Sequence, residues 1–258
     1  HLWWLCPSLP SASLGNTILR YLPDVVALQE CDEKWYAALN SDLAGYKFVN
    51  YDTEDQNKVG DYVNDSTIIY NAETLELIEW EQTPLPTSDN VSARNVTVAV
   101  FRSKESAKVF ICLSTHWCLT EKNRNANSTE TLEIISKWKE KYPTSPIIIG
   151  GDFNAVESEN SIISMTDNTG LIDTKNADST GIICNGYHIG NGMRVEDKDV
   201  TNPDHWIRGP FSFRLSNMKN KETLDHIFAS DTVNSLYFSA IVDRDALNAS
   251  DHRPIYCY

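Results

Sequence analysis

Residues that could carry out acid–base or metal chemistry recur in this sequence at the ends of short apolar runs. In chain order they are Glu30, His116, Asp152 with Asn154, Asp225, and Asp251 with His252. Carboxylates are costly to bury alone, so several of them at neighbouring strand ends predict a bound cation, a proton relay or both.

The apolar runs that must position these residues have the length of β-strands. Segments 24–30 and 146–150 are built around continuous apolar runs, which is typical of strands buried on both faces. Gly150 and Gly151 are expected to let the backbone turn sharply before Asp152. Further strands are predicted over residues 46–51, 66–71, 74–80, 95–102, 108–115, 224–229, 233–242 and 254–258.

Helices are predicted where apolar residues recur at helical spacing, over 14–22, 33–43 and 128–142. Asp32 can cap the second helix, and Pro23 and Pro143 end the first and the third. No break in composition separates the two halves of the chain. We therefore expect one α/β domain over residues 1–258, with two sheets packed face to face and helices outside.

The chain carries a strong excess of acidic residues. Among its 258 residues, 36 Asp and Glu stand against 22 Lys and Arg, for a formal net charge of -14. Nucleases are expected to present Lys- and Arg-rich surfaces, because neutralising phosphates supplies most non-specific affinity for nucleic acid. The charge therefore disfavours a nucleic-acid substrate and leaves it as an alternative. No run approaches the ~18 apolar residues of a membrane-spanning helix, so we expect no membrane span.

Six cysteines form no C-x-x-C pair, so zinc-ligand spacing is absent and small buried side chains are expected. Cys112 and Cys118 are the candidates for a disulfide, because they flank one short segment. Five glycosylation sequons, a number that this composition gives by chance, begin at Asn64, Asn90, Asn95, Asn127 and Asn248. The compartment, secreted or cytoplasmic, stays open, and so does a removed signal peptide.

Five short motifs follow one another in order, each at a strand end: PDVVALQE, STHW, GGDFNA, LDHIFAS and SDHRP. Together they resemble the endonuclease/exonuclease/phosphatase superfamily, also called the DNase I-like fold, from Pro23 to the C-terminus. The resemblance implies a four-layered α/β sandwich of two mixed β-sheets with helices outside. It also implies an active site at one edge of the sheets, and hydrolysis of phosphoester bonds assisted by a divalent cation.

The resemblance implies roles for single residues as well. Glu30 resembles the carboxylate that holds Mg²⁺ or Mn²⁺, and Asp251 resembles a carboxylate that binds the metal directly or through another ligand. Asp152 resembles the residue that orients or deprotonates the attacking water. Asn154 resembles the amide that holds the phosphate oxygens.

Two histidines and an arginine complete the implied site. His252 resembles the histidine that acts on the scissile phosphate, with Asp225 holding its ring and favouring the protonated form. His116 resembles a second histidine, which contacts the phosphate and assists the leaving group. Arg94 lies where many members carry an arginine that faces the phosphate.

One residue of the family pattern has no counterpart in this sequence. Members begin with a strand whose last residue, an Asn, helps to hold the metal. Counting back from Glu30 lands at or before His1, and residues 2–5 contain no Asn. Two interpretations stay open: the Asn precedes His1, or the protein lacks it, which would weaken metal binding.

We therefore expect a metal-dependent hydrolase, a monomer, that cleaves a phosphodiester or a phosphomonoester by water attack. Two alternatives stay open: a DNase-like nuclease, and a catalytically silent binding protein that keeps the fold. The sequence does not choose among nucleic acids, sphingomyelin-like lipids and inositol phosphates as substrates, although the lack of an apolar hairpin disfavours a lipid surface.

Overall fold

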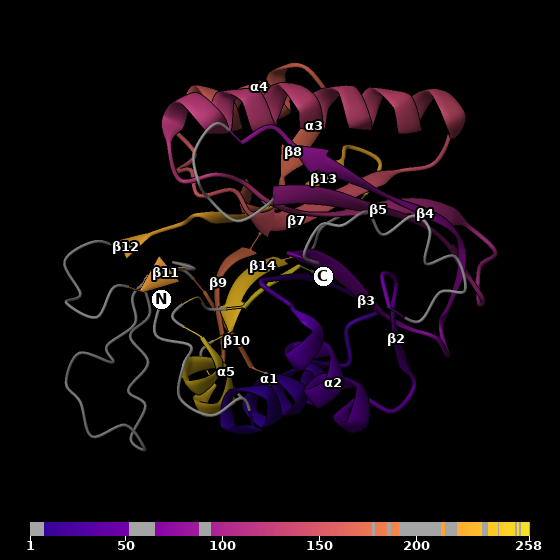
Figure 1. The fold of residues 1–258 in the computed structure, drawn as a ribbon, viewed down its shortest axis with the longest axis vertical. Coiled ribbons are helices and arrows are strands. Elements are labelled where there is room, and N and C mark those ends of the chain that lie inside the picture. Colours follow the sequence, from indigo (N-terminus) through magenta and orange to yellow (C-terminus); the bar gives the residue numbers. More distant parts are fainter. Residues whose placement is uncertain are drawn as a thin grey trace.

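The computed structural model describes residues 8–51, 65–87, 94–176, 179–184, 187–190, 213–214, 221–233, 237–241, 243–250, 252 and 254–257. Figure 1 shows these residues in four layers. Helices α3 (Glu121–Lys141) and α4 (Asn160–Asp167) cover a six-stranded sheet from one side. Helices α1 (Ser8–Tyr21), α2 (Glu33–Asp42) and α5 (Arg244–Ala249) cover a second layer of strands from the other. This is the α/β sandwich that the sequence predicts.

The six-stranded sheet positions most of the predicted site residues. Its strands lie in the order β4 (Leu75–Leu85), β5 (Arg94–Ser103), β6 (Val109–His116), β7 (Ile147–Asp152), β13 (Asp225–Ser230) and β8 (Leu171–Asp173). Strands β6 and β7 pair in parallel and the other neighbours pair antiparallel, so the sheet is mixed.

A hydrophobic core fills the space between this sheet and its two helices. Ile111, Ile149 and Phe228 reach it from the strands, and Ile135 and Trp138 from α3. Full burial of such a side chain stabilises the fold by roughly 1.5–3 kcal/mol. Helix α3 begins at Glu121 and not at residue 128 as predicted. Its first turns bury amide side chains in place of apolar ones, which hides the helical pattern in the sequence.

Within the described residues, the second layer contains a 3-stranded and a 4-stranded sheet, and the predicted sandwich of two strand layers with helices outside is confirmed. One sheet has the order β1 (Val25–Gln29), β3 (Ser66–Asn71), β2 (Tyr46–Phe48). The other has the order β10 (Tyr187–Gly190), β9 (Ser179–Cys184), β14 (Tyr237–Ile241), β15 (Ile255–Cys257). Strands β11 (Phe213–Arg214) and β12 (Lys221–Glu222) form a further small ladder.

The two sheets of the second layer end beside one cavity. Within the described residues, β1 pairs with β3 and β15 pairs with β14, and both strands line a cavity of about 1300 Å³ along their other side. Every residue of β1 is therefore partly exposed. The expectation that this strand is buried on both faces is wrong, because one of its edges faces this cavity.

Gly150 and Gly151 lie inside strand β7, so the sharp turn expected there is also wrong. The structure gives another reason for Gly151. A Cβ on this residue would lie 2.0 Å from the carbonyl oxygen of Thr115 in the neighbouring strand. The missing side chain thus allows β6 and β7 to approach closely just before the strand ends that carry His116 and Asp152.

Other expectations have mixed outcomes. Asp32 caps α2 as predicted, because its side chain accepts hydrogen bonds from the N–H groups of Lys34 and Trp35 at 2.9 and 3.0 Å. Helix α1 begins at Ser8, earlier than predicted, and α5 was not predicted.

Cys112 and Cys118 are both free and buried, so no disulfide joins them. Among the helices that the structure describes, none combines the length and the apolar character needed to cross a membrane.

Candidate active site

The pairing of three adjacent strands brings the central candidates together. In the parallel pair β6–β7, His116 lies opposite Asp152. In the antiparallel pair β7–β13, Asp225 lies opposite Asp152. Residues that are 36 and 73 positions from Asp152 in the sequence therefore become its neighbours in space.

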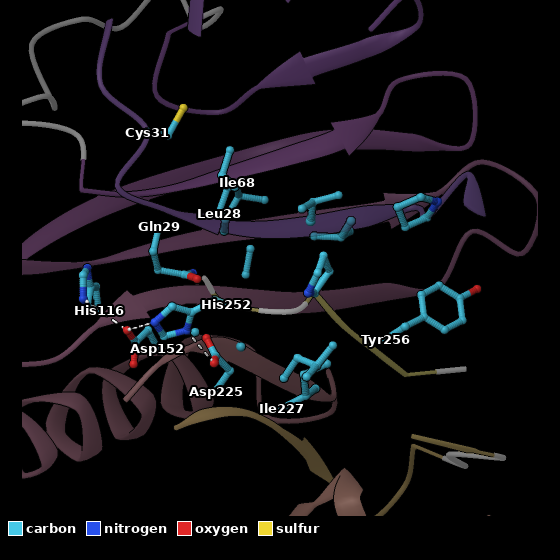
Figure 2. A pocket seen from close by; sticks show the side chains of 18 of the residues that line it. Leu28, Gln29, Cys31, Ile68, His116, Asp152, Asp225, Ile227, His252 and Tyr256 are labelled. Atoms are coloured by element: carbon cyan, nitrogen blue, oxygen red, sulfur yellow. Dashed lines mark hydrogen bonds and ion pairs between the residues drawn. The ribbon is translucent and has the colours of Figure 1, made fainter. Parts of the chain in front are cut away.

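The carboxyl of Asp152 lies between two imidazole rings, with its two oxygens in different surroundings. Oδ1 accepts a hydrogen bond from the backbone N–H of Asn154 at 2.8 Å. Oδ2 lies 3.5 Å from Nε2 of His116 and 3.7 Å from Nε2 of His252. Figure 2 shows the two histidines reaching Asp152 from different sides, at one end of the cavity. Oδ2 is thus the oxygen that faces the histidines.

The ring of His252 is held by Asp225. Nδ1 of His252 lies 2.8 Å from Oδ2 of Asp225, and the pair is drawn in Figure 2. A carboxylate only accepts hydrogen bonds, so this contact assigns a proton to Nδ1. Nε2 therefore faces Asp152 and the cavity.

A second carboxyl and an arginine hold the other histidine. Nδ1 of His116 lies 2.9 Å from Oδ2 of Asp65 and 2.6 Å from Nη1 of Arg94. The same arginine nitrogen donates to the same Asp65 oxygen at 2.9 Å. All three side chains are at least nine-tenths buried. The two histidines thus share one arrangement: a carboxylate lies at Nδ1 and Asp152 lies toward Nε2.

Asn154 is held in an unusual backbone conformation. Its φ of 50° lies in the left-handed region, which Asn tolerates better than most residues. The side-chain Nδ2 donates to the carbonyl oxygen of Trp117 at 2.9 Å. The Trp117 N–H in turn donates to the Asp152 carbonyl at 2.9 Å, so the segments after β6 and β7 are tied together.

The surroundings of Asp152 and Asp65 shift their pKa values in opposite directions. Burial raises the pKa of Asp152 and the charge of Asp225 raises it further, while the two histidines and the Asn154 N–H offset only part of this. For Asp65, burial acts to raise the pKa, but His116 and Arg94 outweigh it, and the pKa lies below its ordinary value. Asp65 is thus held ionised, whereas the proton affinity of Asp152 is increased, as a general base requires.

The described residues include one group of side chains that could hold a metal ion. Ligand atoms of Asp152, Asp225 and His252 all lie within 4.8 Å of one another. Glu30, the metal ligand that the family resemblance implies, is exposed and lines the same cavity. Asp251, the other implied ligand, lies outside the described residues. Carboxylate oxygens are hard donors of the kind that Mg²⁺ and Mn²⁺ prefer. The carboxylates of Asp152, Asp225 and Glu30 therefore fit a divalent cation.

His226, the sequence neighbour of Asp225, points away from these residues. It is 1% exposed, and its ring contacts Oδ2 of Asp173 at 3.2 Å and the carbonyl oxygen of Ala155 at 2.9 Å. Strand alternation predicts this opposite orientation. The contact between His226 and the Ala155 carbonyl therefore stabilises the segment that follows Asp152.

Asp65, which contacts His116 and Arg94, was not predicted from the sequence. Strand β3 runs antiparallel to β1, so the beginning of β3 lies at the same edge as the end of β1. The Glu30 N–H donates to the Asp65 carbonyl at 2.6 Å across this edge. A search for polar residues at the starts of antiparallel strands, as well as at strand ends, would have found it.

The chain is similar to one protein family and to several solved structures. Residues 3–252 match the Endonuclease/Exonuclease/phosphatase family. No curated protein matches the chain in sequence. Among solved structures, a mannosyl-6-phosphatase from Bacteroides thetaiotaomicron is 17% identical with a TM-score of 0.73, and the alignment covers 97% of this chain and 90% of that one.

Two further structures are similar. D. rerio TDP2 in complex with a single-strand DNA product is 18% identical with a TM-score of 0.65, covering 99% of this chain and 93% of that one. The human Nocturnin catalytic domain with bound sulfate is 18% identical with a TM-score of 0.66, covering 96% and 84%. At these identities the structures establish a shared fold alone. The family match, however, spans nearly the whole chain, and the protein belongs to the Endonuclease/Exonuclease/phosphatase family.

Proposed function

We propose that this protein is a divalent-metal-dependent phosphoesterase, which hydrolyses a phosphodiester or a phosphomonoester by attack of water on phosphorus. The observation that carries the proposal is the convergence of two carboxylate–histidine pairs on one oxygen of Asp152. Similar folds occur in a mannosyl-6-phosphatase and in a protein bound to a DNA product, which supports a phosphoester as the substrate.

Asp152 is the proposed general base. Its Oδ1 is occupied by the Asn154 N–H, so Oδ2 is the oxygen that takes the proton of the attacking water. The raised pKa of Asp152 suits this role, because a base works best when its proton affinity approaches the working pH. General-base catalysis of this kind typically raises the rate by about 10³-fold.

The two histidines and Arg94 are the proposed partners of the phosphate. Nε2 of His116 and Nε2 of His252 face the position beside Asp152, where hydrogen bonds to phosphate oxygens stabilise the charge that develops. Nε of Arg94 has no hydrogen-bond partner among the described residues, although the side chain is buried and lines the cavity. A phosphate oxygen would supply the missing acceptor.

A divalent cation would be held by carboxylates at this edge, with Glu30 and Asp251 as the proposed ligands. When bound, it would neutralise phosphate charge. After burial, the charge of Asp225 is the main cause that raises the pKa of Asp152, and a cation beside the two carboxyls would offset this repulsion, which supports a metal at this edge.

The test is a substrate panel assayed with Mg²⁺ and with Mn²⁺. It comprises p-nitrophenyl phosphate, bis-p-nitrophenyl phosphate, a sugar 6-phosphate, plasmid DNA, RNA, sphingomyelin and inositol phosphates. We expect hydrolysis of at least one phosphoester, its loss in EDTA, and its return when the metal is added back. Hydrolysis that continues undiminished in EDTA would refute the metal dependence, and inactivity on the whole panel would favour the silent binding protein.

A further inference from the structure

The side chain of Asn127 joins helix α3 to the segment that follows His116. Asn127 is fully buried, at 0% exposure. Its Oδ1 accepts from the Cys118 N–H at 2.9 Å, and its Nδ2 donates to the carbonyl oxygen of Pro86 at 2.7 Å. These partners fix the orientation of the amide, since a flipped amide would set Nδ2 against a donor and Oδ1 against a carbonyl.

The peptide unit between Trp117 and Cys118 is held at both ends. Asn127 accepts from its N–H, and Nδ2 of Asn154 donates to its carbonyl oxygen at 2.9 Å. A peptide unit is planar, so its N–H and its carbonyl keep a fixed relation. If the N–H loses its acceptor, the carbonyl that orients the Asn154 side chain is no longer fixed.

We infer that Asn127 is a positioning residue of the phosphoesterase site, acting through this peptide unit on the amide of Asn154. The inference rests on the proposed function and on the role that the family resemblance implies for Asn154, whose amide would hold the phosphate oxygens. The backbone of Asn154 is already constrained by its N–H bond to Asp152. The bond to the Trp117 carbonyl then sets the direction of the side chain, and Asn127 determines where that carbonyl lies.

Asn127 also begins a glycosylation sequon, Asn-Ser-Thr. In the folded protein its Nδ2 is buried and donates to the Pro86 carbonyl. Glycan attachment requires an exposed amide, so this sequon is not an acceptor once the chain has folded. The amide serves the site instead.

The matched control is Ser128, the next residue of the same helix. Ser128 is 3% exposed, and its hydroxyl bonds to the Ser161 carbonyl at 3.0 Å and lies 2.6 Å from the Ser164 hydroxyl, both in α4. Ser128→Ala therefore removes buried hydrogen bonds between α3 and α4 and leaves the hydrogen bonds of Asn127 and Asn154 in place. It should lower the melting temperature and leave kcat unchanged.

Two substitutions at Asn127 separate positioning from stability. Asn127→Ala should lower kcat on the best substrate of the panel by on the order of ten-fold, with little change in KM, because alignment matters most in the transition state. Asn127→Asp keeps an acceptor for the Cys118 N–H while placing an oxygen against the Pro86 carbonyl. It should lose stability yet retain kcat close to the wild type. A kcat that follows the melting temperature across all three variants would overturn the inference.

A double-mutant cycle tests the path through Asn154. If Asn127 acts through that amide, Asn127→Ala should have little further effect on kcat in an Asn154→Ala background. Losses that multiply would show that Asn127 acts by another route and would overturn the inference. The cycle requires that Asn154→Ala still has activity above the assay background. It is therefore measured with the most reactive aryl phosphoester of the panel.

Hydrogen exchange in the wild-type protein tests the contact without any variant. The Cys118 amide should exchange slowly, since it donates to a buried acceptor, and exchange at the rate of an unprotected amide would overturn the inference. The two proposals fail differently. An inactive wild type on every phosphoester refutes the proposed function, whereas an active wild type with an equally active Asn127→Ala refutes the positioning role alone.

Discussion

His252 and Asp225 are 27 residues apart in the chain, and Nδ1 of the histidine lies 2.8 Å from Oδ2 of the aspartate. If the carboxylate holds the ring for catalysis, Asp225→Asn and His252→Ala should each lower kcat/KM by on the order of a hundred-fold. The double variant should lose little more, because residues that act as a unit are not additive. Steady-state kinetics on the four proteins of this cycle measures the coupling.

Asp231 supplies the control for this cycle. It is exposed, and it follows the opposite end of the same strand, β13. Asp231→Asn removes one negative charge from the same part of the sequence and should leave kcat/KM unchanged. Independent, multiplying losses for Asp225 and His252 would contradict the account of them as one pair.

Gly151 and Gly150 form a natural pair of tests for the close approach of β6 and β7. A Cβ at Gly151 would lie 2.0 Å from the Thr115 carbonyl, whereas a Cβ at Gly150 would meet its nearest neighbour, the Ala27 Cβ, at 3.4 Å. Gly151→Ala should therefore lower the free energy of unfolding by about 3 kcal/mol, and Gly150→Ala by less than about 1 kcal/mol. Urea unfolding measures both, and equal losses would mean that the strands do not approach in this way.

Asp65 predicts a particular dependence of stability on pH. Its pKa is lowered in the fold, so its ionised form stabilises the protein above the ordinary carboxyl pKa, and this stabilisation is lost as pH falls through the lowered value. Asp65→Asn leaves Arg94 and His116 buried without their carboxylate and should cost about 3 kcal/mol near neutral pH. The difference from wild type should shrink in acid. A difference that stays constant from pH 7 to pH 3 would contradict the ionised pair.

Much of the candidate site could be predicted from the sequence, because its residues end apolar runs. His116 and Asp152 follow the two strands that pair in parallel, and parallel strands end at one edge of a sheet. Asp65 could not be found in this way, since it precedes an antiparallel strand. Its partner Arg94 also begins a strand, and its burial against Asp65 is a tertiary contact that sequence spacing does not carry.

The fold was predictable in class and less so in detail. Apolar periodicity located every strand of the six-stranded sheet except the short edge strand β8, which was not predicted. It failed at the start of α3, where Asn127 is buried through hydrogen bonds to Cys118 and Pro86 and not through apolar contacts. It also could not indicate the strand order of the second layer, because strand order depends on pairing between distant segments.

In the proposed reaction, Asp152 takes a proton from water during phosphoester hydrolysis. Asp152→Asn keeps the size of the side chain and its contact with the Asn154 N–H, and removes the ionised carboxyl whose pKa burial and Asp225 raise. The most direct measurement is therefore the turnover of the best phosphoester by wild type and by Asp152→Asn with Mg²⁺, alongside their thermal melts. We expect Asp152→Asn to lose on the order of a thousand-fold in kcat and to melt at a temperature equal to or above that of wild type. Turnover by Asp152→Asn at the wild-type rate would contradict this role of Asp152.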